Sequence, residues 1–146
     1  QQYVDRIDYG NRELSGNPGK HDGLTQAWLS SSLALSPQEQ ARFLGKLVSG
    51  KLPVSAEAVR RTSTLLRQPD IDGWQIHGKT GMGYPKLLDG SLNRDQQIGW
   101  FVGWASKQDQ KLIFVHTVIQ KPGKQFASLR AREEVFAALP EQLKKL

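Results

Sequence analysis

The chain has 146 residues, a length typical of one domain that buries about 70% of the surface exposed by its unfolded form. It contains no cysteine, which excludes disulfides and thiolate metal sites, and its apolar runs are too short to span a membrane. Its formal net charge is +6, but the 20 Lys and Arg residues are scattered and form no basic stripe interleaved with aromatic residues, so the charge does not indicate nucleic-acid binding.

The first third of the sequence predicts short helices around a loop. Residues 1–8 have the spacing of the last turns of a helix, and a helix that begins at residue 1 without a cap suggests that chain precedes it. Residues 9–23 are rich in glycine and form a predicted loop. Residues 24–29 then predict one helical turn.

Two helices with marked start signals follow. Ser36-Pro37-Gln38-Glu39 is a capping box with proline at the first helical position, and Gly50 predicts the end of that helix. Ser55 is the expected cap of the next helix, which ends before Pro69. The predicted apolar face of the first helix is Phe43, Leu44, Leu47 and Val48, and that of the second is Val59, Thr62, Leu65 and Leu66.

The period of the apolar residues then changes from helical to alternating. Trp74–Thr80, Gln97–Ala105 and Leu112–Ile119 are predicted strands of an antiparallel three-stranded meander, with a loop over Gly81–Arg94. Residues 126–139 predict a closing helix whose inner face is Phe126, Leu129, Phe136 and Leu139. The order of elements indicates an α+β fold in a single domain, residues 1–146.

The strongest candidate for chemistry is Lys79-Thr80-Gly81, at the end of a predicted strand. An ammonium group there offers three donors and a fixed positive charge, which suits a carboxylate-bearing ligand or a proton relay. Gly81 lets a ligand lie against the backbone, and the amide of Met82 is placed to donate to a developing oxyanion. The alternative is that the tripeptide is a chance occurrence at a strand end.

Other polar and aromatic residues are weaker candidates. Tyr9 and Asn11 flank a glycine, as in an ordinary turn, and Trp28 is either an indole donor or a core anchor. Arg130 is able to hold a carboxylate bidentately or to be a solvated helix charge. The three histidines lack the spacing of metal ligands, so no metal site is expected.

Taken in order, five segments resemble the class D, or oxacillinase-type, serine β-lactamases, whose signatures include Lys-Thr-Gly. The resemblance covers nearly the whole chain but matches only the C-terminal half of such an enzyme. It implies an α/β/α fold of the transpeptidase type. The segments are Tyr9-Gly10-Asn11, Ala27-Trp28-Leu29, residues 35–40, Gly78-Lys79-Thr80-Gly81 and residues 99–104.

The resemblance implies a serine acyl-enzyme mechanism in which a lysine carboxylated by carbon dioxide is the general base. Both residues belong to a Ser-x-x-Lys motif, and no Ser or Thr of this chain has Lys three residues later. That motif is therefore expected upstream of Gln1, and the chain alone is expected to be inactive and to hold no cofactor.

The resemblance also implies roles for the residues that are present. Lys79 positions the substrate and assists proton transfer, Thr80 binds the substrate carboxylate, and the Met82 amide completes the oxyanion hole. Trp28 holds the carboxylated lysine, while Tyr9 and Asn11 shape the pocket floor. Ser128 and Arg130 are alternative partners of the substrate carboxylate, and the loop at 81–94, with Tyr84 and Leu87, borders the entrance.

The expected function is hydrolysis of β-lactams in the periplasm, with the upstream half of the protein as partner. One alternative is a β-lactam sensor domain that is acylated but does not turn over. The other is a catalytically dead domain that only folds or binds. Neither a membrane segment nor a nucleic-acid partner is expected of this chain.

Overall fold

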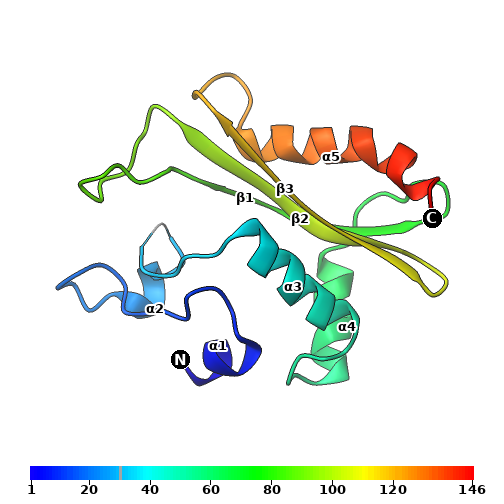
Figure 1. Cartoon of the computed structure of the whole chain (residues 1–146), viewed down its shortest axis with the longest axis horizontal. Coiled ribbons are helices and arrows are strands. Elements are labelled where there is room, and N and C mark those ends of the chain that lie inside the picture. Colours follow the sequence, from blue (N-terminus) through cyan, green and yellow to red (C-terminus); the bar gives the residue numbers. More distant parts are fainter. Residues whose placement is uncertain (30) are drawn as a thin grey trace.

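A three-stranded antiparallel sheet lies between two layers of helices in the computed structural model, which describes residues 1–29 and 31–146 (Figure 1). Helix α5 covers one face of the sheet, and α3 and α4 lie against the other. The predicted meander and the α/β/α layering are confirmed. The elements are α1 (Gln2–Ile7), α2 (Gly23–Gln26), α3 (Pro37–Val48), α4 (Ala56–Leu65), β1 (Gln75–Gly83), β2 (Gln97–Lys107), β3 (Gln110–Gln120) and α5 (Ala127–Leu143).

Alternating residues of β2 build both cores. Phe101 and Ala105 point toward α5, where they pack with Val135 and Leu139 of that helix. Trp104 points the opposite way, into a second core on the α3 side. This alternation is the reason that the strand is apolar almost throughout, because each of its faces is covered by a helix.

The capping box at the start of α3 forms as predicted. Ser36 Oγ accepts a hydrogen bond from the Glu39 amide at 3.2 Å, and Glu39 Oε2 accepts one from the Ser36 amide at 2.8 Å. Leu44 and Leu47 are the buried apolar residues of the helix. The helix is therefore fixed at its first turn by the cap and along its length by the second core.

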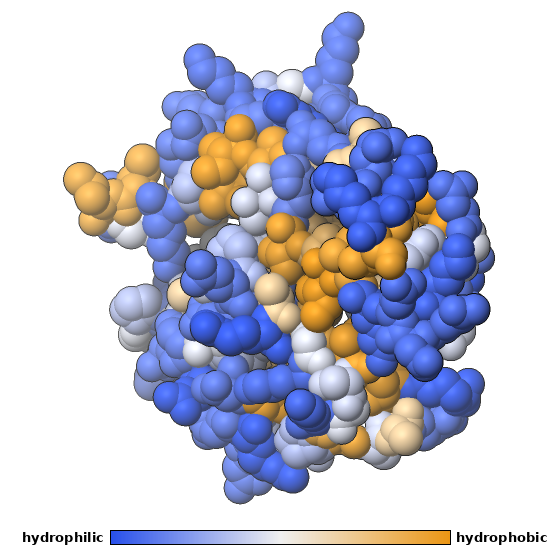
Figure 2. All heavy atoms as spheres, turned by 45° about the vertical axis from the view of Figure 1, so that its right-hand side comes forward, coloured by the Kyte–Doolittle hydropathy of each residue, from blue (hydrophilic) through white to orange (hydrophobic). Residues whose placement is uncertain are grey.

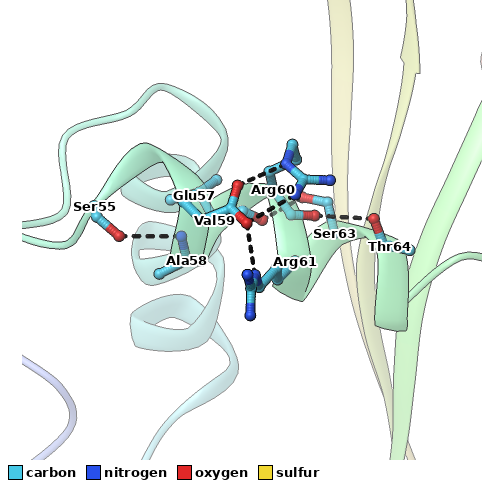
Figure 3. Close-up of polar contacts among 8 residues, drawn as sticks. All are labelled: Ser55, Glu57, Ala58, Val59, Arg60, Arg61, Ser63 and Thr64. Carbon is cyan, nitrogen blue, oxygen red and sulfur yellow. Dashed lines mark hydrogen bonds and ion pairs between the residues drawn. The ribbon is translucent and has the colours of Figure 1, made fainter.

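Helix α4 is held mainly by its own polar contacts (Figure 3). None of its residues is buried. Ser55 Oγ accepts from the Ala58 amide at 3.1 Å, which confirms the predicted cap, and Glu57 accepts from Arg60 at 2.8 Å and from Arg61 at 2.6 Å. Such i,i+3 and i,i+4 pairs each add only tenths of a kcal/mol, so α4 is a weakly anchored element.

The predicted inner face of α4 is partly wrong. Val59 and Leu66 do pack against the second core, but Thr62 is exposed and Leu65 is 85% exposed. The half-buried residue between Val59 and Leu66 is Ser63, whose hydroxyl donates to the Val59 carbonyl at 2.9 Å. The pattern of apolar residues did not identify the inward face of the helix correctly. One inward position is occupied by Ser63, a polar residue that can be half-buried because its hydroxyl is hydrogen-bonded within the helix.

The closing helix also differs from its prediction. It runs through Pro140 to Leu143, because Leu139 and Leu143 are both buried in the first core and hold the last turn against the sheet. Its inner face includes Ala127, Ala131 and Val135, whereas Phe126 and Leu129 are 56% and 47% exposed. The predicted Leu139 is buried and Phe136 packs against the same core, so that half of the prediction is confirmed. The prediction was wrong for Phe126 and Leu129, whose place is taken by small residues that bring the helix close to the sheet.

Strand β1 is longer than predicted. The sequence predicts a loop over residues 81–83, but this segment continues the strand: Gly81, Met82 and Gly83 pair with Trp100, Gly99 and Ile98 of β2. The hydrogen-bonding partner strand extends the ladder through glycines that have little strand propensity of their own. As a result, all of Lys79-Thr80-Gly81-Met82 lies on the regular part of a sheet.

On the face drawn in Figure 2, hydrophobic side chains gather in several places, in the middle and toward the upper left, between hydrophilic ones. Among the described residues, no helix is both long enough and apolar enough to cross a bilayer.

Candidate active site

One hollow of about 420 Å³ collects most of the residues singled out in the sequence. Strand β1, the segments around Tyr9 and Trp28, and α3 all contribute lining residues. The lining residues are Tyr9, Trp28, Leu33, Leu35, Gln40, Lys79, Thr80, Gly81, Met82, Gly83, Tyr84, Ile98, Trp100 and Val102. Two parts of the chain that are far apart in sequence therefore meet at this hollow.

Lys79 supplies a cation to the hollow. Its side chain is exposed, and Nζ donates to the Thr80 carbonyl oxygen at 2.8 Å and to Thr80 Oγ1 at 3.4 Å. These contacts hold the ammonium beside the Thr80 hydroxyl. A negatively charged group entering the hollow would thus meet a positive charge and a hydroxyl on neighbouring residues of a rigid strand.

Tyr9 and Trp28 are the aromatic residues that the N-terminal part of the chain contributes to the hollow. The Tyr9 hydroxyl donates to Gln40 Oε1 at 2.8 Å, and burial raises the pKa of Tyr9, so the phenol is protonated at neutral pH. Trp28 is 57% exposed, which identifies it as a wall residue rather than a core anchor.

Asn11 does not line the hollow but ties its wall together. Asn11 Nδ2 donates to the Ser32 carbonyl at 2.9 Å, and Oδ1 accepts from the Ala34 amide at 3.0 Å. Gly10 has φ of 56°, and a Cβ at this position would collide with the Ala34 carbonyl oxygen. The motif thus joins residues 9–11 to residues 32–34, where only glycine permits so close an approach.

Ser128 and Arg130 lie outside this hollow. The Ser128 amide packs directly on Gly99 of β2, whose partner on β1 is Met82. Arg130 Nε instead donates to Glu134 Oε1 at 2.7 Å, next to a 2.7 Å hydrogen bond between His116 and Glu134 Oε2. Hydrogen bonds from His116 and Arg130 lower the pKa of Glu134, which keeps it a carboxylate that holds the guanidinium.

A second hollow, of about 330 Å³, lies on the α3–α4 side and is lined mainly by apolar residues. The two hollows share three wall residues: Gln40, Lys79 and Val102. Its apolar lining includes Ile7, Phe43, Leu44, Leu47, Leu52, Val59, Leu66 and Trp104.

The sequence prediction missed Gln40. The residue is buried, at 8% exposure, and it stands in the same phase as Leu44 and Leu47 on α3. A polar residue in an apolar helical stripe was the signal that would have identified it, because a buried amide requires a hydrogen-bond partner.

His77 lies on β1 two residues before Lys79, and its imidazole is buried. The ring stacks on Trp104 with centroids 4.7 Å apart and planes 8° apart. Among the described residues, Nδ1 has no hydrogen-bond partner. Burial, and to a lesser extent the charge of Arg67, lowers the pKa of His77 from its ordinary value of 6.5, so the folded protein disfavours the charged ring.

Acidification is expected to destabilise the protein through His77. As the pH falls below about 6.5, the unfolded chain protonates this residue before the folded chain does, so stability is lost as pH falls from there through the folded pKa. His77→Phe keeps the stacking and removes the titrating group. We expect the free energy of unfolding of the variant, measured in urea relative to that of the wild-type full-length protein, to be more favourable at about pH 5 than at about pH 8. An equal difference at both pH values would contradict this.

No cluster of three or more His, Cys, Asp or Glu residues suited to a metal is present in residues 1–29 and 31–146. The residues that line the first hollow offer an ammonium, hydroxyl groups, backbone amides and aromatic rings. This set is able to bind and polarise an anionic carbonyl compound.

Comparison with known proteins identifies the family of this chain. Residues 1–141 match the penicillin binding protein transpeptidase domain. Beta-lactamase OXA-9 from Klebsiella pneumoniae is 41% identical over 95% of this chain, and the chain spans 52% of that relative. The crystal structure of the class D beta-lactamase OXA-427 is 91% identical, with a TM-score of 0.95 over 99% of this chain and 60% of that one.

A receptor is also similar. The C-terminal domain of the Bacillus licheniformis BlaR penicillin-receptor is 25% identical, with a TM-score of 0.75 over 97% of this chain and 51% of that one. The chain thus spans about half the length of the relatives that it matches.

Proposed function

Because the chain belongs to the penicillin-binding protein transpeptidase family and groups within it with the class D β-lactamases, we propose that the full-length protein hydrolyses β-lactam antibiotics through a serine acyl-enzyme. The observation that carries the proposal is the hollow that Lys79 and Thr80 on β1 line together with Tyr9 and Trp28. The nucleophilic serine and its carboxylated lysine belong to the part of the protein outside this chain.

Each residue of this wall has a proposed role. Lys79 positions the β-lactam and assists proton transfer, and Thr80 donates to the substrate carboxylate. The Met82 amide completes the oxyanion hole with the amide of the nucleophile. Trp28 donates its indole N–H to the carboxylated lysine. Asn11 supports the floor next to Tyr9 through its contacts with residues 32–34.

Ser128 is the better of the two candidates for the substrate carboxylate. Its backbone packs on Gly99, one strand away from the wall, whereas the guanidinium of Arg130 is engaged by Glu134. A Ser128→Ala variant is the direct check, and a raised KM for penicillins without a similar effect of Arg130→Ala is the outcome that supports it.

The test of the function is turnover by the purified full-length protein. A chromogenic cephalosporin is expected to be hydrolysed, whereas residues 1–146 alone are expected to give no turnover because they contain no Ser-x-x-Lys. Turnover by the chain alone that survives Lys79→Ala would contradict the proposed site.

The similarity to the penicillin-receptor supports one alternative, a β-lactam sensor. In that case, mass spectrometry of the full-length protein would detect a stoichiometric acyl adduct that persists for hours without release of product. The enzyme instead loses the adduct at a rate that matches its turnover. For either function we also propose a periplasmic location, where such antibiotics act.

A further inference from the structure

Gln40 is a buried amide whose surroundings are largely apolar. It lies on the first turns of α3, its side chain is 8% exposed, and Leu44 and Leu47 are buried on the same face of the helix. Burial of an amide without a hydrogen bond costs about 1–3 kcal/mol, so a glutamine at this position needs a partner. Its partner is Tyr9, 31 residues earlier in the sequence.

Two residues of α3 hold the Tyr9 ring. The hydroxyl donates to Gln40 Oε1 at 2.8 Å. The rings of Tyr9 and Phe43 pack edge to face, with centroids 4.9 Å apart and planes 72° apart. Gln40 and Phe43 are three residues apart and therefore neighbours on the helix surface, one fixing the polar tip of Tyr9 and the other its apolar body.

The helix that carries these two residues is itself fixed at this end. The Gln40 amide donates to the Ser36 carbonyl at 3.0 Å, in the turn that the Ser36–Glu39 capping box closes. The backbone from which the Gln40 side chain extends is therefore held in place by the hydrogen bonds of the capped first turn.

The hydrogen bond determines what Tyr9 offers to the hollow. A phenol has one proton, and in Tyr9 that proton is directed to Gln40, so only oxygen lone pairs remain for other partners. The same hollow contains the ammonium of Lys79. With its proton fixed on Gln40, the Tyr9 oxygen presents lone pairs to the hollow that contains the Lys79 ammonium. A freely rotating hydroxyl would instead present its proton toward the ammonium in some orientations.

We propose that Gln40 is a positioning residue of the β-lactam site, which orients the Tyr9 hydroxyl as an acceptor in the hollow that Lys79 also lines. This inference rests on the proposed function. Gln40 acts through Tyr9 and is not proposed to contact the substrate.

The test is a double-mutant cycle in the full-length protein, read as kcat/KM for a chromogenic cephalosporin. Gln40→Met, which keeps the length of the side chain and removes the acceptor, is expected to lower kcat/KM about five- to tenfold. In a Tyr9→Phe background, the same substitution is expected to change it less than about twofold. Gln40→Glu keeps an acceptor oxygen and is expected to restore most of the activity.

Gln38→Met is the matched control, because Gln38 is an exposed glutamine on the same helix, and it is expected to leave kcat/KM unchanged. An equal loss from Gln40→Met with and without the Tyr9 hydroxyl would overturn the inference, since Gln40 would then act independently of Tyr9. So would wild-type activity of Gln40→Met.

Failure of the proposed function can be distinguished from failure of this inference, because in the first case the wild-type protein does not turn over the cephalosporin. The acylation rate with a labelled penicillin then replaces kcat/KM in the same cycle, with the same expected coupling. Loss of that coupling while the wild-type protein is acylated would refute the role of Gln40 alone.

Discussion

Lys79→Ala in the full-length protein is expected to lower kcat/KM for a chromogenic cephalosporin ten- to hundredfold. The ammonium lies in the hollow beside the Thr80 hydroxyl, and a charge-assisted hydrogen bond to an anionic substrate contributes about 1.5–3 kcal/mol. Because Lys79 is an exposed residue of a regular strand, the substitution removes its charge without opening a cavity in either core.

Two companion variants separate the charge at the site from charge in general. Lys124→Ala removes a cation from the exposed connection between β3 and α5 and is expected to retain full activity. Lys79→Arg keeps the charge but not the compact geometry of the ammonium, so a partial loss is expected. An unchanged kcat/KM for Lys79→Ala would refute the role of this residue.

Gly99→Ala is expected to lower the free energy of unfolding of the full-length protein by at least about 3 kcal/mol. This is at or above the upper end of the cost that is usual when a core is overpacked. A Cβ at position 99 would overlap the carbonyl of Ala127 and the amide of Ser128 at the start of α5. These are backbone atoms, so relief requires α5 to move away from the sheet that it covers. Urea unfolding, with the midpoint compared between variant and wild type, measures the loss.

Gly45→Ala is the matched control for this prediction. Gly45 lies within α3, and a Cβ there would meet only Ile113 Cδ1, at an ordinary contact distance of 3.5 Å. Alanine is the better helix former by about 1 kcal/mol, so this variant is expected to be as stable as the wild type or more so. If the two variants unfold at the same urea concentration, the close contact of α5 with Gly99 is not important for stability.

Local signals in the sequence were sufficient for most of the fold. The cap at Ser36, the cap at Ser55 and the alternation of the three strands depend on neighbouring residues, and all were predicted correctly. The predictions were wrong where contacts between residues far apart in the sequence determine the secondary structure. Met82 is held in β1 by Gly99 of the partner strand, and the turn after Pro140 is held by burial of Leu143 in the core.

The site follows the same division. Lys79, Thr80, Gly81 and Met82 are consecutive in sequence, so a motif was enough to identify this side of the hollow. Gln40 was not identified, because its importance depends on a hydrogen bond to a residue 31 positions away. A pattern of residue types does not contain that information unless the pairing of the segments is already known.

The first hollow and the apolar hollow share three wall residues, Gln40, Lys79 and Val102, and this has an evolutionary consequence. Leu44 lines the apolar hollow but not the first hollow, so a substitution there changes the packing on only one side of these shared residues. Under the proposed function, selection for a more stable interior and selection for a different β-lactam would therefore act on shared side chains. Lineages of this protein are expected to acquire changes of the two kinds together rather than independently.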